Sequence, residues 1–404
     1  MTGTEGSAAG SGCREGGTVS RASFLKDVFL CSLGAYGGPE AHMGVFLDQM
    51  VVKRRYLDEE ELIELIALCS LLPGPTSTQT IVAIGHKTGG PLLGLLTMIV
   101  WACPVLLVMT ALSFLYQFLD MLDISRSVLR YVGPMAAGFI AVAAFRIGRK
   151  VVTDRVTALL LLFGAGVTFF FRNPWVFPAV LLSGGAVMLL LRGEQGMWHR
   201  AEASPPWRYL VLFLLFAAGG AVMREGGFLP AELFERFYRY GYLVFGGGQV
   251  VVPLMFSELV EARSFLTGQE FLTGYGLVQG LPGPMFSFAA YAAGMAAREG
   301  SIPFQALTAI AGGVGIFLPG LLLIYFVYPV WNSVREIRAI RISLRGINAA
   351  AGGMIAASAA LMMGAAGFSG ENLAVFGATA ALLVSGKIPA PLIVAASLAA
   401  GALI

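Results

Sequence analysis

Two copies of one short motif are the residues of this sequence that point most directly to chemistry. Leu72-Pro73-Gly74-Pro75 recurs as Leu281-Pro282-Gly283-Pro284. Proline lacks a backbone N–H and clashes with the preceding helical turn, so each motif ends one helix and begins another. A helix that begins at Pro75 has its next free N–H groups on the three residues that follow. Those donors and the positive end of the helix dipole favour an anion.

Small hydroxylated side chains beside both motifs add further donors. They are Thr76, Ser77 and Thr78 after the first motif and Ser287 after the second. A tetrahedral oxyanion suits such a site, because each of its oxygens accepts hydrogen bonds. A single motif would be explained as a turn between helices. Two copies at matching positions favour a site at the tips of two membrane hairpins, the first built from segments 59–72 and 76–88.

Glycine interrupts the apolar pattern at a second place in each half. Gly37-Gly38-Pro39 is matched by Gly246-Gly247-Gly248. Such glycines form a backbone nest for an anion or let helices pack closely, and the sequence leaves both interpretations open. His42 follows the first break. It is either a proton-coupling group, because imidazole titrates near neutral pH, or a hydrogen-bonded residue at the membrane surface.

These matches belong to an internal repeat that covers most of the chain. The first break and the first proline motif recur 209 positions later. Further along the offset is 215, which pairs Pro104 with Pro319 and indicates one insertion of six residues. Colinear matches over this length predict two homologous repeats, at 21–191 and 230–404.

Composition places this repeat in a membrane. Charged residues are 13% of the chain and hydrophobic residues 57%, whereas a typical soluble domain is about 25% charged. Charged side chains are absent from 91–119, 301–334, 346–370 and 388–404. A run of about 20 apolar residues spans a bilayer as a helix, whose backbone groups are satisfied internally. The sequence therefore predicts an all-α, polytopic membrane protein with broken or re-entrant helices.

Basic residues predict how the two halves are oriented. Each half has a cluster, but at a different point of the repeat: Arg146, Arg149, Lys150 and Arg155 in the first, and Arg335, Arg338, Arg341 and Arg345 in the second. Cytoplasmic loops carry the excess of Lys and Arg, so the repeats are expected to be inverted. The polar linker and apolar crossover segment at 192–229 have no counterpart in the first repeat. A parallel duplication with uneven charges is the alternative.

Several classes of protein and site are excluded. The formal charge of +3 argues against a nucleic-acid partner, and the scattered cysteines Cys13, Cys31, Cys69 and Cys103 against a zinc site or disulfide framework. The chain has no Walker A, HExxH or GxSxG motif. We therefore expect no enzyme activity, catalytic residue, metal or cofactor. Residues 1–20 are rich in Gly, Ser and Thr and are predicted to be a disordered tail.

The motifs resemble those of the chromate transporter family. Gly38-Pro39-Glu40-Ala41-His42 is similar to the N-terminal signature of that family, and Leu72 through Gln79 to its proline motif. In the second half, Gly246 through Pro253 is similar to a glycine-rich stretch of the family, and Gln279 through Pro284 to its second proline motif. Ser70 departs from the pattern, since many members carry glutamine there.

The resemblance implies a secondary active transporter that exports chromate from the cytoplasm across the cell membrane. Sulfate or another small oxyanion is the alternative substrate, and a channel or structural membrane protein is the alternative class. The expected partners are chromate or sulfate and the lipid bilayer, and a homodimer stays open. The residues that the motifs and the resemblance assign to the oxyanion site are Gly37, Gly38, Pro39, His42, Pro73, Gly74, Pro75, Thr76, Ser77, Gln79, Gly246, Gly247, Gly248, Gln249, Gln279, Pro282, Gly283, Pro284 and Ser287.

Overall fold

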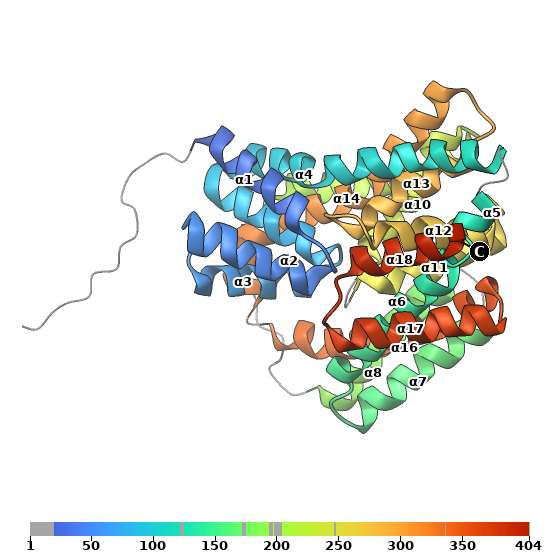
Figure 1. Ribbon diagram of the computed structural model, residues 1–404. Coiled ribbons are helices and arrows are strands. Elements are labelled where there is room, and N and C mark those ends of the chain that lie inside the picture. The colour runs from blue at the N-terminus through green and yellow to red at the C-terminus, as the bar shows by residue number, and fades with distance from the viewer. Residues whose placement is uncertain are drawn as a thin grey trace, which may run out of the picture.

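Every regular element in the described part of the chain is a helix (Figure 1). The computed structural model describes residues 20–121, 125–171, 175–193, 197, 204–245, 248–335 and 337–403. Four helices in these ranges are long and apolar enough to cross a membrane, by length and composition: Thr76–Leu119, Val132–Val151, Ile302–Val334 and Arg338–Ala366. The predicted all-α, polytopic membrane fold is confirmed.

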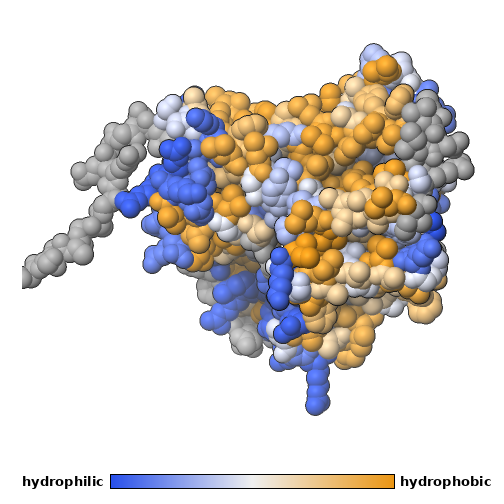
Figure 2. All heavy atoms as spheres, in the orientation of Figure 1, coloured by the Kyte–Doolittle hydropathy of each residue, from blue (hydrophilic) through white to orange (hydrophobic). Residues whose placement is uncertain are grey.

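The surface of the molecule suits a lipid environment. Figure 2 shows hydrophobic residues across much of the visible face, with hydrophilic residues gathered toward its left edge and lower part. Large apolar side chains lie fully on the outside, such as Phe170, which is 77% exposed, and Leu190, which is 84% exposed. Apolar surface of this extent is favourable against hydrocarbon and unfavourable against water.

The first half contains α1 to α8. Their bounds are Arg21–Gly34 for α1, Pro39–Phe46 for α2, Leu47–Lys53 for the π-helical segment η1, Glu59–Leu71 for α3, Thr76–Met121 for α4, Ser125–Val128 for α5, Val132–Val151 for α6, Arg155–Phe170 for α7 and Val176–Arg192 for α8. The helix α9, Trp207–Glu225, follows in the linker.

The second half contains α10 to α18. The bounds up to the second proline motif are Leu229–Tyr242 for α10, Gly248–Val251 for η2, Val252–Phe256 for α11, Ser257–Ala262 for the π-helical segment η3 and Gly268–Val278 for α12. After it come Met285–Ser287 for η4, Phe288–Ala296 for α13, Ile302–Val327 for α14, Tyr328–Val330 for η5, Trp331–Val334 for α15, Arg338–Ala366 for α16, Gly370–Ser385 for α17 and Ala390–Leu403 for α18.

The two halves repeat fine details of the backbone. A π-helical segment follows the glycine break in each half, as η1 and as η3. The residues two positions beyond them, Arg55 and Ser264, both have a φ of 52°, a left-handed conformation that is uncommon outside glycine. The next helix then begins at a capping box, at Asp58 in α3 and at Thr267 in α12. Turn chemistry repeated at one offset confirms two homologous halves.

Each proline motif joins two short helices into a hairpin. In the first, α3 has 13 residues, and the helix after the motif is interrupted at Gly89 and Gly90, where the backbone leaves the helical conformation. A helix of that length reaches ~20 Å, less than the ~30 Å thickness of a hydrocarbon core. Glu61 and Lys87 pair at the open end of this hairpin. These are the re-entrant, broken helices that the sequence predicts.

Equivalent helices of the two halves run in opposite directions. Arg130, just before α6, donates to Glu371, just after α16, at 2.6 Å. At the other end of α6, Thr153 accepts from Arg345, near the start of α16, at 2.9 Å. The helices α6 and α16 are repeat equivalents and both are long enough to span, so an antiparallel pair means inverted repeats. The second contact also brings the two basic clusters to the same side, as the positive-inside argument requires.

The two halves interlock and do not form separate lobes (Figure 1). The helix α16 packs along α7 so closely that a Cβ on Gly353 would lie 1.9 Å from the Leu161 carbonyl oxygen. The equivalent contact joins α6 to α17, where a Cβ on Gly138 would lie 3.0 Å from Thr379. Small residues let membrane helices approach in this way. The two sequence repeats therefore fold together into a single packed unit.

Candidate substrate-binding site

The proline motifs and glycine breaks meet across the two halves. The N–H of Gly74, at the first hairpin tip, donates to the Val244 carbonyl at the second break, at 2.8 Å. The N–H of Gly283, at the second tip, donates to the Ala35 carbonyl at the first break, also at 2.8 Å. The repeat offset carries the first pair of residues onto the second. The equivalent hydrogen bond therefore forms twice, and the break of each half binds the hairpin tip of the other half.

Glycine is required at both tips and at the first break. Gly74 has a φ of +134° and Gly283 a φ of +104°. Gly37 and Gly38 have φ values of +86° and +88°. Residues that carry a Cβ rarely adopt this left-handed backbone conformation, whereas glycine adopts it without steric cost. The glycines of the motifs therefore set the turns that bring tips and breaks together.

The first tip presents backbone donors at the start of the helix that follows the motif. The helix α4 begins at Thr76, so the N–H groups of its first turn have no acceptor within the helix. The side chain of Gln79 folds back over the tip, where Nε2 donates to the Pro73 carbonyl at 2.9 Å and faces Gly320 O at 3.4 Å. Ser77 beside it is only 5% exposed. Polar groups of one tip thus gather in the protein interior.

The second tip carries a comparable polar group. Ser287 closes the short helix η4 by donating its N–H to Pro284 O at 3.0 Å. Gln249, just after the second break, accepts from the Tyr275 hydroxyl, and its Nε2 lies 3.7 Å from the Met285 sulfur. The residue that follows the second break therefore reaches the residue that follows the second tip.

His42 lies in the core of the molecule. It is 2% exposed, and its ring packs edge-on against Trp101 with the centroids 5.4 Å apart. The imidazole lies at the Ala35 carbonyl, which also accepts from Gly283. The alternative that His42 is a surface residue is therefore wrong. Its burial comes from Trp101 and the opposite hairpin tip, which are distant in sequence.

Four of the predicted site residues carry a buried polar atom without a partner among the described residues. These atoms are His42 Nδ1, Gln79 Oε1, Gln279 Nε2 and Ser287 Oγ. Buried polar groups in proteins are nearly always hydrogen-bonded, and an exception calls for a physical reason. Atoms of this kind lie at both tips and beside the first break, and the described residues contain others elsewhere, such as Thr168 Oγ1 and Gln305 Nε2.

Each tip region packs on a long apolar helix of the other half. Pro75 lies 3.4 Å from the Cβ position of Gly320 on α14, and the Cβ position of Gly283 lies 3.1 Å from Val105 on α4. The helices α4 and α14 contact each other. Gly248 begins η2, while Gly246 and Gly247 lie outside the described residues. Pro39 begins α2.

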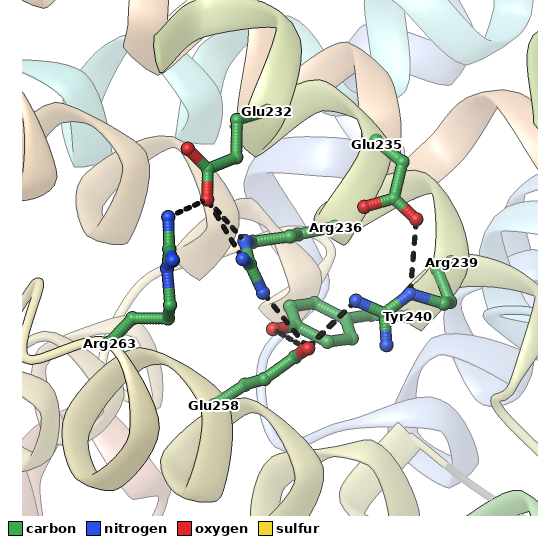
Figure 3. A network of polar contacts seen from close by, with 7 residues as sticks. All are labelled: Glu232, Glu235, Arg236, Arg239, Tyr240, Glu258 and Arg263. Atoms are coloured by element: carbon green, nitrogen blue, oxygen red, sulfur yellow. Dashed lines mark hydrogen bonds and ion pairs between the residues drawn. The ribbon is translucent and has the colours of Figure 1, made fainter. Parts of the chain in front are cut away.

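The sequence interpretation missed a buried ionic network next to the second break. Figure 3 shows Glu232, Glu235, Arg236, Arg239 and Tyr240 of α10 facing Glu258 of η3 and Arg263. The charged positions 232, 235, 236 and 239 fall on one face of a helix, in a chain with few charges. That spacing was a signal in the sequence, because it predicts a helix face that carries several charges in a chain that has few.

The first half has a simpler version of this network. Asp27, which is fully buried, accepts from Arg54 at 2.7 Å, from the Tyr56 hydroxyl at 2.6 Å and from Gln49 Nε2 at 3.3 Å. Both networks join the helix before a break to the π-helical segment after it. Neither resembles a metal centre, and the described residues contain no group of three His, Cys, Asp or Glu side chains that could hold a metal ion.

Comparison with known proteins agrees with the motifs. The sequence profile of the family described as "Chromate transporter" matches residues 22–189 and 231–402. A "Probable chromate transport protein" of Synechococcus elongatus is 27% identical over 92% of this chain and 93% of its own length. A "Chromate transport protein" of Pseudomonas aeruginosa is 27% identical over 83% of this chain and 79% of its own. An "Uncharacterized transporter YwrB" of Bacillus subtilis is 26% identical over 40% of this chain and 84% of its own length. No solved structure matches the chain.

Proposed function

Because this chain belongs to the chromate transporter family, we propose that it exports chromate from the cytoplasm across the cell membrane as a secondary active transporter. Relatives named as chromate transport proteins cover most of the chain. The helices long enough to span a membrane, the inverted repeats and the broken hairpins support a transporter in particular, since alternating access uses such elements. Sulfate, a tetrahedral dianion of nearly the same shape, is expected to compete.

The oxyanion binds, in this proposal, between the two hairpin tips. The observation that carries this is the set of buried polar atoms without partners at both tips. The Gln279 amide and the Ser287 hydroxyl are donors to the oxyanion, together with the free N–H groups that begin α4. Gln79 Oε1 and His42 Nδ1 accept from water that enters with the anion.

The expected affinity is modest. Each helix N-terminus contributes about 0.3–2 kcal/mol toward an anion, and a hydrogen bond to a charged group contributes about 1.5–3 kcal/mol. Part of this is spent in removing a dianion from water. Weak binding suits a transporter, because the substrate has to leave on the other side.

A negative charge at either tip tests the proposal. Thr76→Asp or Met285→Asp would occupy the backbone donors from within and repel a dianion. Removing one side chain tests less, because many of the donors are backbone groups. We expect both variants to abolish chromate uptake into inside-out membrane vesicles. Thr76→Ser, which keeps the hydroxyl, should transport as the wild type does.

Two controls make this result interpretable. The aspartate variants should insert into the membrane and purify as single species, so that a loss of transport is not a loss of folding. Saturation of wild-type uptake and its dependence on an ion gradient would separate a transporter from a channel. If both aspartate variants transport chromate at the wild-type rate, the oxyanion does not bind at the tips, and the Pro-Gly-Pro motifs serve only as turns.

A further inference from the structure

The buried ionic network beside the second break has the form of an anion site that already holds an anion of the protein itself (Figure 3). We propose that Arg236 and Arg239 form a second oxyanion-binding site, and that the carboxylate of Glu258 occupies it until substrate takes its place. This inference rests on the proposed function for the class of substrate. It adds a site that the proline motifs do not include.

The contacts of Glu258 are those of a bound oxyanion. Its Oε1 accepts from Arg236 Nη1 at 2.9 Å and from Arg239 Nη2 at 2.8 Å. Its Oε2 accepts from Arg239 Nη2 at 3.1 Å and from the Tyr240 hydroxyl. Glu258 is only 6% exposed. Two guanidinium groups and a phenol thus converge on one carboxylate in the protein interior, where charge-assisted hydrogen bonds are strong.

The charge balance makes Glu258 replaceable. Within the network drawn in Figure 3, three arginines face three glutamates. Arg236 also holds Glu232, at 2.8 Å, and Arg239 also holds Glu235, at 3.1 Å. Each arginine therefore keeps one carboxylate when Glu258 withdraws, and the network as a whole, in which Arg263 shares Glu232 with Arg236, is left with one uncompensated positive charge. An incoming oxyanion supplies the missing negative charge and accepts the same N–H groups.

The network extends from the protein surface toward the first hairpin tip. Arg263, whose side chain is 46% exposed, binds Glu232 at the outer end. Arg239 lies at the inner end, and its carbonyl accepts from Leu243 N at 3.2 Å. The next residue is Val244, the acceptor for Gly74 at the first tip. Glu258 itself lies on the π-helical segment η3, and such irregular turns are frequent at functional sites.

The first half provides a matched control. By the repeat offset of 209, Asp27 stands where the second half has Arg236, and Gln49 stands where it has Glu258. Asp27 is held by one arginine, Arg54, whose side chain is 44% exposed. Removing the Asp27 charge therefore leaves no buried arginine pair, so the two networks should respond differently to the same neutralising substitution.

The test is equilibrium binding of radiolabelled sulfate to the purified, full-length protein in detergent. Every protein carries Thr76→Asp, which keeps sulfate away from the tips. We expect Glu258→Gln to bind sulfate at least about tenfold more tightly than its Thr76→Asp parent, corresponding to ~1.4 kcal/mol. Asp27→Asn should leave the sulfate affinity unchanged. Adding Arg239→Gln to Glu258→Gln should remove the gain, because one arginine of the pair is lost.

A second measurement checks sulfate binding independently, through its effect on protein stability. Thermal unfolding in sulfate is compared with unfolding in chloride at equal ionic strength, for Glu258→Gln and for the shorter carboxylate Glu258→Asp. Sulfate should raise the unfolding temperature most for Glu258→Gln and less for Glu258→Asp. If sulfate binds and stabilises Glu258→Gln no more than the parent, the second site does not exist. That result leaves the tip site standing, because the tips are tested separately by the transport of Thr76→Asp.

Discussion

Alanine at Gly74 tests how the first hairpin tip is built. The φ of Gly74 is +134°, and a Cβ at this position would lie 2.6 Å from Gln79 Nε2 and 2.9 Å from its Cδ. Gln79 is 1% exposed and therefore has little room to move. Gly74→Ala should strain the backbone and also push Gln79 away from the Pro73 carbonyl.

The cost can be worked out from these contacts. A residue held in a sparsely populated backbone conformation costs about 1–3 kcal/mol. Loss of the hydrogen bond from Gln79 Nε2 to Pro73 O adds about 0.5–1.5 kcal/mol. We therefore expect Gly74→Ala to lower the free energy of unfolding by ~2–4 kcal/mol. Gly283→Ala should cost less, since the atom nearest to its Cβ would be Val105 Cγ1, at 3.1 Å.

The assay combines thermal unfolding in detergent with chromate uptake into vesicles. Gly34→Ala is the control, because the Cβ position of Gly34 is open and lies at the end of α1. We expect the highest unfolding temperature for Gly34→Ala, a lower one for Gly283→Ala and the lowest for Gly74→Ala. Uptake should fall most for Gly74→Ala, since Gln79 belongs to the proposed site. Wild-type stability and transport in Gly74→Ala would refute both the geometry of the tip and the role given to Gln79.

Two further predictions concern orientation and pH. Single cysteines at Ser125 and Ser333, placed after the native cysteines are replaced, should be labelled from opposite sides of the membrane; labelling from one side would contradict the inverted repeats. The Thr157 backbone N–H, which donates to Asp154 at 2.8 Å, lowers the pKa of the Asp154 carboxyl below its ordinary 3.8, and Arg192 and Arg345 lower it further. A depressed pKa stabilises the fold above the unfolded-state value and stops doing so as pH falls through the folded-state value. Asp154→Asn should therefore lower the unfolding temperature at pH 7 and make progressively less difference below pH 3.8; a difference that does not change with pH would show that the carboxylate charge is not involved.

Local patterns in the sequence predicted the repeat, the hairpins and the inversion. Pro73 and Pro75 end and begin helices by their own covalent structure, so the first tip could be placed without tertiary information. The partner of Gly74 could not be predicted, because Val244 is an ordinary apolar residue in the other half. The burial of His42 was missed for the same reason, since it depends on Trp101.

The ionic network was missed for another reason. The charges of α10 are present in the sequence with helical spacing, on the helix that precedes the second break. The pairing of Arg236 with Glu258 connects a helix with a π-helical segment beyond a break. Helical periodicity indicates which face of α10 is charged but not what that face meets.

The two hydrogen bonds between hairpin tips and breaks also impose an order on the synthesis and membrane insertion of the protein. The ribosome makes Gly74 well before Val244, so the Gly74 N–H enters the membrane before its acceptor exists. The Ala35 carbonyl is likewise synthesised before its donor, the Gly283 N–H. An unpaired backbone group in hydrocarbon costs several kcal/mol, so the first half settles only when the second half has been inserted. A chain of half this length would need a second copy of itself to supply those partners.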